Sequence, residues 1–457
     1  MSDATTATPE DRVAKLVTDH PWVSRVHREP DGALLVTPAA SATAVTPALG
    51  PLVREYLDQW TEVYEWVYEA GEGRHADDLD LSGWRSSDTG ELLPRAHMRD
   101  WVDRTMDLVL AQQPRRVLEL GCGTGLLAHR LHLQLDGYVG TDVAQAAVDR
   151  LAAAALPRTA FVRAAAHEAG SSQVHRAADL VFGHGTRPDC VLLNSVTQCF
   201  PSLAYLAEVL REAIATVEDG GTVIVGDNRH SALLDEHFGR LERQRDPDAD
   251  APTVGERVAA AVAADEELSF APAAVAGAVA GQGRPVRMSV HARTMADATE
   301  LTRYRYDIVL RVGRADGGQR PDEIRREPWE AHSGAGLAIA LRTALADPPV
   351  LLHGVPNALL VDAVGAVTPY ALRRALTGTD AAVLLDPADP RLLSVAAPAD
   401  AAGTAVEEVA APASGPAVHE PLPAFVSRRL PEVLRDHLRR AAPGTALPRI
   451  TVVETTL

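Results

Sequence analysis

A short segment, VLELGCGTG at residues 117–125, combines the residue types with which α/β proteins bind a nucleoside. An apolar run containing an acidic residue is followed by three glycines and then by a helical pattern. Glycine lets the chain turn sharply and approach a ligand closely, and a helix start offers free N–H groups to ligand oxygens. We therefore predict a cofactor-binding turn with contacts from Glu119, Gly121, Cys122, Gly123 and Gly125.

The glycine spacing bears on which cofactor binds. The dinucleotide fingerprint is G-x-G-x-x-G, whereas here the third glycine comes one position early and Leu126 stands in its place. S-adenosylmethionine (SAM) has no pyrophosphate, and its oxygens belong to a carboxylate and a ribose. The spacing favours SAM, and a dinucleotide fold and a chance strand-turn are the alternatives.

The next strand candidate, GYVGTDV, ends in a carboxylate, Asp142. In nucleoside-binding α/β folds an acidic residue at the tip of the second strand accepts hydrogen bonds from the ribose hydroxyls. We predict this role for Asp142, with Val143 beside it, and an adenine contact from Ala166 after the third strand. Alternatively, Asp142 caps the helix that starts at Ala144.

Polar side chains follow the fourth strand candidate in DCVLLNSVTQCF. Asn194, Ser195 and Gln198 stand just past its carboxyl end, where ligands bind in open parallel sheets. The amide oxygen of Asn194 can accept a hydrogen bond from an amine and orient its lone pair. We predict Asn194 as a catalytic and cofactor-contacting residue, assisted by Ser195 or Gln198; the alternative for Asn194 is a helix cap.

The elements that must position these residues alternate between residues 116 and 226. Short apolar runs are separated by amphipathic helical patterns. Strands that are apolar on both faces, with helices between them, indicate a mainly parallel sheet with right-handed crossovers. The predicted fold class is α/β: a doubly wound, Rossmann-like sheet with an N-terminal helical lid and a smaller C-terminal α+β region.

Bulk properties exclude several classes. The 457 residues suffice for two or three domains, and the net charge of −18 disfavours nucleic acid or an anionic membrane as a partner. The three cysteines form no CxxC pair and show no metal-site spacing, so no metal is expected. A polar N-terminus and the lack of an apolar run of about 18 residues predict a cytoplasmic protein.

Taken in order, the pieces resemble the methyltransferase domains embedded in nonribosomal peptide synthetases. The matching segments cover roughly residues 51–313 and include LDQWTEVYEWVY, SGWRSSDTGELLP, PRRVLELGCGTGLLAHRL, YVGTDVA, VLLNSVTQCFPS, GGTVIVGDNRH and TELTRYRYDIVLRVG. The resemblance implies a class I SAM-dependent methyltransferase. It also implies N-methylation of an amino acid or of a carrier-bound aminoacyl thioester, with a peptidyl carrier protein as partner. An O- or S-methyltransferase acting on a related intermediate is the near alternative.

The same resemblance implies a lid and shows departures. We expect SGWRSSDTG to fold over the cofactor through Trp84, Ser87 and Thr89, unless Trp84 is an ordinary core residue. The family usually has tyrosine where Asp88 stands, an aromatic where Cys199 stands and glutamate at position 97, where this chain has histidine. The departures at Asp88 and Cys199 favour a second hypothesis, a non-catalytic SAM-binding protein that docks to a synthetase.

The tail RRLPEVLRDHLRRAAPGTALPRITVVETTL resembles the start of the small C-terminal subdomain of adenylation domains. It holds no lysine, so adenylation activity is not expected, and the resemblance suggests a free-standing methyltransferase with a remnant of that subdomain. The expected organisation is an N-terminal extension (1–50), the methyltransferase domain with its lid (51–313), an accessory α/β region (314–400), a linker (401–420) and the remnant (421–457).

Overall fold

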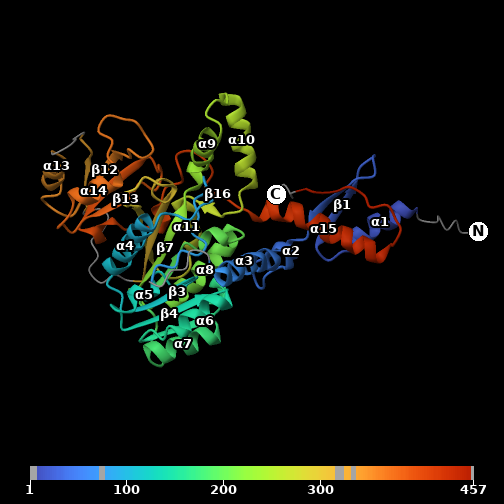
Figure 1. Cartoon of the computed structure of the whole chain (residues 1–457), viewed down its shortest axis with the longest axis horizontal. Helices are drawn as coiled ribbons and strands as arrows, with labels where there is room; N and C mark the ends of the chain where they lie inside the picture. Colours follow the sequence, from blue (N-terminus) through green and yellow to red (C-terminus); the bar gives the residue numbers. More distant parts are fainter. Residues whose placement is uncertain (1–7, 72–77, 314–323, 331–335, 454–457) are drawn as a thin grey trace, which may run out of the picture. The chain divides into compact units, whose positions relative to one another are not determined.

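The computed structural model describes residues 8–71, 78–313, 324–330 and 336–453 (Figure 1). The chain divides into two compact units. Unit 1 consists of Met1–Trp60, Ala263–Glu266 and Glu420–Leu457, and unit 2 consists of Thr61–Val262 and Glu267–His419.

Unit 2 is built on one large sheet with the strand order β11-β12-β14-β13-β9-β10-β7-β6-β3-β4-β5. Its strands are β3 (Arg116–Leu120), β4 (Gly137–Asp142), β5 (Thr159–Arg163), β6 (Cys190–Asn194), β7 (Thr222–Arg229), β9 (Val286–Ala292), β10 (Arg305–Val312), β11 (Arg325–Pro328), β12 (Val350–Pro356), β13 (Ala382–Leu385) and β14 (Leu392–Ala397). Strands β5, β4, β3, β6 and β7 are parallel. The predicted doubly wound parallel sheet is therefore confirmed, and its switch point lies between β3 and β6.

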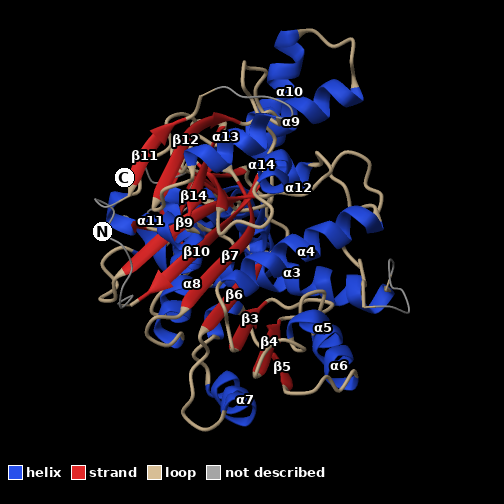
Figure 2. Ribbon diagram, turned by 90° about the vertical axis from the view of Figure 1, so that its left-hand side faces the viewer, coloured by secondary structure: helices blue, strands red, loops and turns tan. Residues whose placement is uncertain are grey.

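Helices cover both sides of this sheet (Figure 2). They are α4 (Arg95–Ala111), α5 (Ala128–Leu131), α6 (Gln145–Ala153), α7 (Ser172–Phe182), α8 (Leu203–Thr216), α9 (Leu234–Arg245), α11 (Pro272–Val279), α12 (Glu300–Arg303), α13 (Leu337–Ala344) and α14 (Pro369–Ala375). Helix α4 buries Trp101 and Met98 in one core cluster with Leu192 of β6 and Ile224 of β7. The helix predicted directly after the glycine turn is only one turn long, α5, because bends and turns occupy residues 121–127.

The segment RPVRMSVHAR, in which apolar and polar residues alternate, forms the antiparallel strand β9. On β9 the fully buried residues alternate with the partly buried Arg287, Ser289 and His291. Strand β10 lies between β9 and β7 and is antiparallel to both. One face of β9 therefore carries a row of polar side chains.

The unit boundaries differ from the expected ranges. Strands β11 to β14 of the region 314–400 continue the same sheet, joined through Leu384 of β13 opposite His291 of β9; residues 314–323 and 331–335 lie outside the described part. The expected linker 401–420 pairs with unit 2, because β15 (Thr404–Ala405) lies against β9 and β16 (Val418–His419) pairs with β8 (Ser269–Phe270). Backbone pairing thus holds this segment in place, although its Ala/Pro/Gly-rich composition indicates a linker.

Unit 1 joins the two ends of the chain. Its elements are α1 (Pro9–Thr18), β1 (Val23–Arg28), β2 (Leu34–Pro38), α2 (Ala40–Thr43), α15 (Leu422–Ala441) and β17 (Ile450–Val452). Strands β1 and β2 form an antiparallel hairpin, and β17 pairs with β2 in parallel. Residues 1–50 and 421–457, expected as separate segments, therefore share one fold unit. Helices α3 (Pro51–Ala70) and α10 (Ala251–Ala264) run from one unit into the other.

Candidate cofactor and acceptor site

The glycine turn lies at the carboxyl end of β3, at the switch point. Gly121, Gly123 and Gly125 have φ angles of 82°, 52° and 85°, in the left-handed region that favours glycine. The N–H groups of Gly121 and Cys122 both donate to the carbonyl of Thr141, at 2.8 Å each. The turn is thereby fixed against the end of β4.

Close packing adds a second reason for glycine here. A Cβ atom on Gly121 would lie 2.7 Å from Cγ2 of Val196, in the loop after β6, and one on Gly125 would lie 2.4 Å from Leu151 of α6. The glycine turn and the loop after β6 are therefore in direct contact. The thiol of Cys122 is buried and its pKa is raised well above its ordinary value, chiefly by burial.

Asp142, at the tip of β4, is tied to the glycine turn. One carboxylate oxygen accepts the N–H of Gly123 at 2.8 Å, and the other accepts the N–H of Ala144 at 2.9 Å. Burial raises the pKa of this carboxyl, and the backbone N–H groups oppose that shift. Asp142 is not the N-cap residue of α6, because that residue is Ala144 and no side chain caps the helix there. The contact with Gly123 brings the two predicted cofactor features together. The ribose contact stays a prediction.

Two tyrosines of α3 border the site, and sequence reasoning did not include them. A Cβ on Gly123 would lie 3.0 Å from the hydroxyl oxygen of Tyr68. The rings of Tyr68 and Tyr64 lie 5.6 Å apart, and the Cys199 thiol lies 3.6 Å from the Tyr64 hydroxyl. The pKa of the Tyr68 phenol is raised well above its ordinary value, chiefly by burial, so it stays protonated. The four-residue spacing of the two tyrosines in a helical pattern is the signal that could have shown them on one helix face.

Asn194 ends β6 and is buried. Its Oδ1 atom has no hydrogen-bond partner in the described part of the chain. A Cβ on Gly226 of β7 would lie 2.4 Å from that atom, so only glycine fits opposite it. Gln198 donates from Nε2 to the carbonyl of Ser195 at 2.8 Å, while its buried Oε1 also lacks a described partner. Two amide oxygens in this loop are thus available to a ligand N–H or O–H group, and a buried acceptor left without a donor is costly.

Ser195 and Asp227 adopt strained backbone conformations at the ends of neighbouring strands. Their φ angles are 55° and 62°, in the left-handed region. The Ser195 hydroxyl donates to a carboxylate oxygen of Asp227 at 2.5 Å. Strained non-glycine residues cluster at functional sites. Ser195 was predicted here, whereas Asp227 was missed although GDNRH belongs to the matching segments.

Asp227 is the centre of a buried polar network. Its carboxylate accepts the indole N–H of Trp101 at 3.2 Å and lies 3.8 Å from the guanidinium groups of Arg293 and Arg305. Its own N–H donates to Asp307 at 2.7 Å. Burial raises the pKa of Asp307, and the neighbouring Arg293 opposes that shift. This network holds Asp227 in a fixed position beside Ser195.

Glu119 lies within β3, two residues before the glycine turn. It is buried, and it accepts a hydrogen bond from the hydroxyl of Tyr138 on β4. Burial raises its pKa to about 8, and the tyrosine hydrogen bond acts in the opposite direction. The hydrogen bond of the Glu119 side chain is thus made to a neighbouring strand of the sheet. A contact between Glu119 and the cofactor stays a prediction.

The three residues predicted to form a lid over the cofactor, Trp84, Ser87 and Thr89, contact other parts of the protein. The Trp84 ring packs edge-on against Trp101 at 4.6 Å and joins the hydrophobic core cluster, as the core alternative expects. Ser87 is exposed, and its N–H donates to Glu300 at 3.1 Å. Thr89 is exposed, and its hydroxyl accepts the N–H of Glu91 at 3.2 Å.

The remaining predicted contacts follow strands β4 and β5. The Val143 carbonyl accepts a hydrogen bond from Arg163 at 3.0 Å. Ala166 is buried at the start of a short 3-10 helix after β5.

In the described residues, no group of three or more His, Cys, Asp or Glu side chains could hold a metal ion, and no helix is long and apolar enough to cross a membrane.

Comparisons with known proteins identify relatives of the segment that holds the site. Residues 118–223, which run from β3 to β7, match the family model described as a methyltransferase domain. The chain is 34% identical over 307 residues to a probable non-canonical nonribosomal peptide synthetase, CymA, of Salinispora arenicola, covering 66% of this chain and 4% of that protein. It is 31% identical over 313 residues to chondramide synthase cmdD of Chondromyces crocatus, covering 67% and 8%.

A solved structure of phosphoethanolamine N-methyltransferase 1 from Haemonchus contortus, in complex with phosphoethanolamine and S-adenosylhomocysteine, is 13% identical. The alignment covers 59% of this chain and 51% of that one, with a TM-score of 0.37.

The strand order, the glycine turn and the family match define a class I SAM-dependent methyltransferase domain. It is of the kind embedded in nonribosomal peptide synthetases, and the chain spans only a small part of the curated relatives that it matches.

Proposed function

We propose that this chain transfers a methyl group from SAM to the nitrogen of an amino acid or of an aminoacyl thioester held on a carrier protein. The observation that carries the proposal is the pair of buried amide oxygens, Asn194 Oδ1 and Gln198 Oε1, which lack partners in the described part of the chain. Asn194 ends β6 and Gln198 lies in the loop that follows, which touches the glycine turn through Val196. An amine N–H can satisfy these acceptors.

SAM, when bound, supplies an electrophilic methyl group on a sulfonium for in-line transfer to a nucleophile. The glycine turn and Asp142 would hold the nucleoside, with Tyr64 and Tyr68 beside them. The protein must align donor and acceptor and exclude water. A strong base is not required, because an α-amine has an ordinary pKa of about 7.7–8.0 and is partly neutral near pH 7.

In this proposal Asn194 and Gln198 hold the neutral amine with its lone pair toward the methyl group. Ser195 keeps the loop in its strained conformation through its hydrogen bond to Asp227. The carboxylate of Asp227 and the indole of Trp101 act as positioning groups, because the contacts that the structure shows for them are with other protein groups.

The test is transfer of labelled methyl from SAM to a carrier protein loaded with an amino acid, with the free amino acid assayed in parallel. The variant Asn194→Ala should bind SAM about as well as the parent and lose about tenfold to a hundredfold in turnover, the range expected for a hydrogen bond to a reacting group. Asn357→Ala is the matched control, because Asn357 is equally buried and its amide oxygen instead accepts the N–H of Leu359. Undiminished turnover in the Asn194 variant would remove Asn194 from the mechanism.

A further inference from the structure

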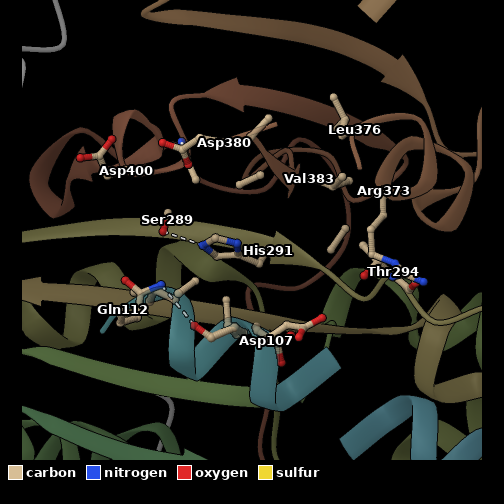
Figure 3. Close-up of a pocket in the computed structure, with 18 of the residues that line it drawn as sticks. Asp107, Gln112, Ser289, His291, Thr294, Arg373, Leu376, Asp380, Val383 and Asp400 are labelled. Atoms are coloured by element: carbon tan, nitrogen blue, oxygen red, sulfur yellow. Dashed lines mark hydrogen bonds between the residues drawn. The ribbon is translucent and has the colours of Figure 1, made fainter. Parts of the chain in front are cut away.

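A cavity of about 670 Å³ lies away from the glycine turn, between the polar face of β9 and β10, helix α4 and residues 373–403 (Figure 3). Its volume falls within the range of small-molecule sites, about 300–1,000 Å³. Arg287, Ser289 and His291 line it from β9. The feature that calls for an explanation is the charge on this strand face.

Arg287 and Arg311 are direct cross-strand partners on β9 and β10, and both line the cavity. Like charges placed directly opposite each other destabilise a sheet. The Arg287 guanidinium donates to the carbonyl of Gly403, and the Arg311 guanidinium donates to the side-chain oxygen of Gln112 at 3.0 Å. Both of these acceptors are neutral, so the described contacts leave the charge of the pair uncompensated.

His291, farther along the same face of β9, adds no charge at neutral pH. Its Nε2 lies 2.8 Å from the Ser289 hydroxyl. Burial, together with the nearby Arg311, lowers its pKa to about 4. On the facing side, Arg373 lines the cavity and bonds to the Thr294 carbonyl at 3.2 Å, again a neutral acceptor.

Four acids, Asp107, Asp307, Asp380 and Asp400, also line the cavity, and none of them forms an ion pair with Arg287 or Arg311 in the described part of the chain. Asp307 is engaged by Arg293 at 2.8 Å, and Asp107 is engaged by Arg104. In Figure 3, Asp380 and Asp400 lie on one side of the Ser289–His291 pair. Asp380 accepts the N–H of Ala399 at 3.4 Å, and the carboxylates on this side could accept hydroxyl or amine groups of a ligand.

We propose that the cavity binds a small organic anion, a carboxylate or a phosphate, whose charge lies against Arg287 and Arg311. The anion supplies the compensation that the cross-strand pair lacks, and charge-assisted hydrogen bonds from two guanidinium groups provide affinity. Arg287 and Arg311 are not among the residues proposed for methyl transfer, so the test of anion binding does not depend on the activity proposed above.

The experiment measures thermal unfolding and calorimetric binding of the full chain with inorganic phosphate and with succinate at constant ionic strength. Sodium chloride serves as the reference salt. We expect at least one of the two anions to raise the unfolding temperature in a saturable way, and the one that does so identifies the acidic group. Arg311→Gln should weaken that binding by about tenfold to a hundredfold.

A control separates a binding role from a structural one. Arg176→Gln removes the same charge from the exposed face of α7 and should leave anion binding unchanged. Without anion, Arg311→Gln should unfold at the same or a higher temperature than the parent, because it relieves the like-charge contact. The proposal is overturned if neither anion binds beyond the chloride reference, or if Arg311→Gln binds them as tightly as the parent.

Discussion

The carboxyl ends of β6 and β7 show how single residues set the chemistry of the site. Ser195 and Asp227 both have left-handed backbone conformations. The hydrogen bond between their side chains helps to offset the cost of these strained conformations. Asn194, one residue earlier, keeps its amide oxygen buried without a described partner. Residues that cost stability are retained where a ligand uses them.

Asp142 should determine affinity for the cofactor. Asp142→Asn keeps the shape of the side chain but removes the charge, and we expect affinity for SAM to fall about tenfold or more, because hydrogen bonds to a charged acceptor are the stronger ones. Titration calorimetry measures this directly. The control is Asp149→Asn, since Asp149 lies exposed on α6 and is bonded to Gln145. Equal affinity in both variants would exclude a charged ribose contact.

Glu119 should make stability depend on pH. Its pKa is about 8 in the folded protein, against an ordinary value of 4.5. Between these values the folded chain keeps a proton that the unfolded chain releases, so rising pH favours unfolding. Compared with Glu119→Gln, the parent should therefore lose stability as the pH rises from about 5 to 8. Urea unfolding of both proteins at pH 5.5 and 8 checks this, and a constant difference would contradict it.

At the scale of elements, much of the sheet could be predicted from the sequence. Strands β3, β4, β6 and β7 are buried on both faces and contain short apolar runs, while β9 alternates between buried and partly buried residues, so the hydrophobic pattern identifies them. The same reasoning singled out Asn194 and Asp142, because polar residues at strand ends stand out, and their roles stay predictions. It missed Asp227 and Tyr68, because their roles come from contacts with residues far away along the chain. Composition also misled at 401–420, where backbone pairing, which carries no side-chain signature, holds the segment.

The glycine turn offers a test at this scale. Gly121→Ala combines a positive φ with a Cβ 2.7 Å from Val196, whereas Gly185→Ala has a φ of 69° and open space around its Cβ. We expect Gly185→Ala to cost about 1–2 kcal/mol in the free energy of unfolding and Gly121→Ala to cost more.

Adding Val196→Ala to Gly121→Ala should recover part of the difference between the two glycine variants, because the Cγ2 atom at 2.7 Å is removed while the Cβ of residue 196 stays at 3.0 Å. Denaturant unfolding of the parent, the two glycine variants and the double variant measures the free energy of unfolding of each. If the double variant recovers nothing, the contact with Val196 is not what makes the turn require glycine.

At the scale of the whole molecule, unit 1 is assembled from both ends of the chain. The Phe425 ring of α15 is buried edge-on against Tyr56 of α3 at 5.4 Å, and Tyr56 donates to the carbonyl of Glu266 at 2.9 Å. Arg429 of α15 pairs with Glu55 at 2.6 Å. The tail resembles part of an adenylation subdomain, but only the structure shows that residues 8–60 complete the same unit.

Phe425→Ala should destabilise both ends together. We expect a loss of about 3–5 kcal/mol in the stability of unit 1, as for other large-to-small core substitutions. Limited proteolysis should then cleave within both residues 8–50 and 422–453, while fragments of unit 2 persist. Arg435→Ala on the same helix is the control, because Arg435 is not part of the buried face. Cleavage confined to the C-terminal segment would show that the two ends fold independently.

The pairing of β17 with β2 also orders events during synthesis. Leu34 and Ile450 are register partners, yet more than four hundred residues separate them along the chain. As the chain leaves the ribosome, the first hairpin emerges long before the strand that completes its sheet. The sheet of unit 2 has all its strands available earlier, so it can form while the opening segment still waits for its last partner.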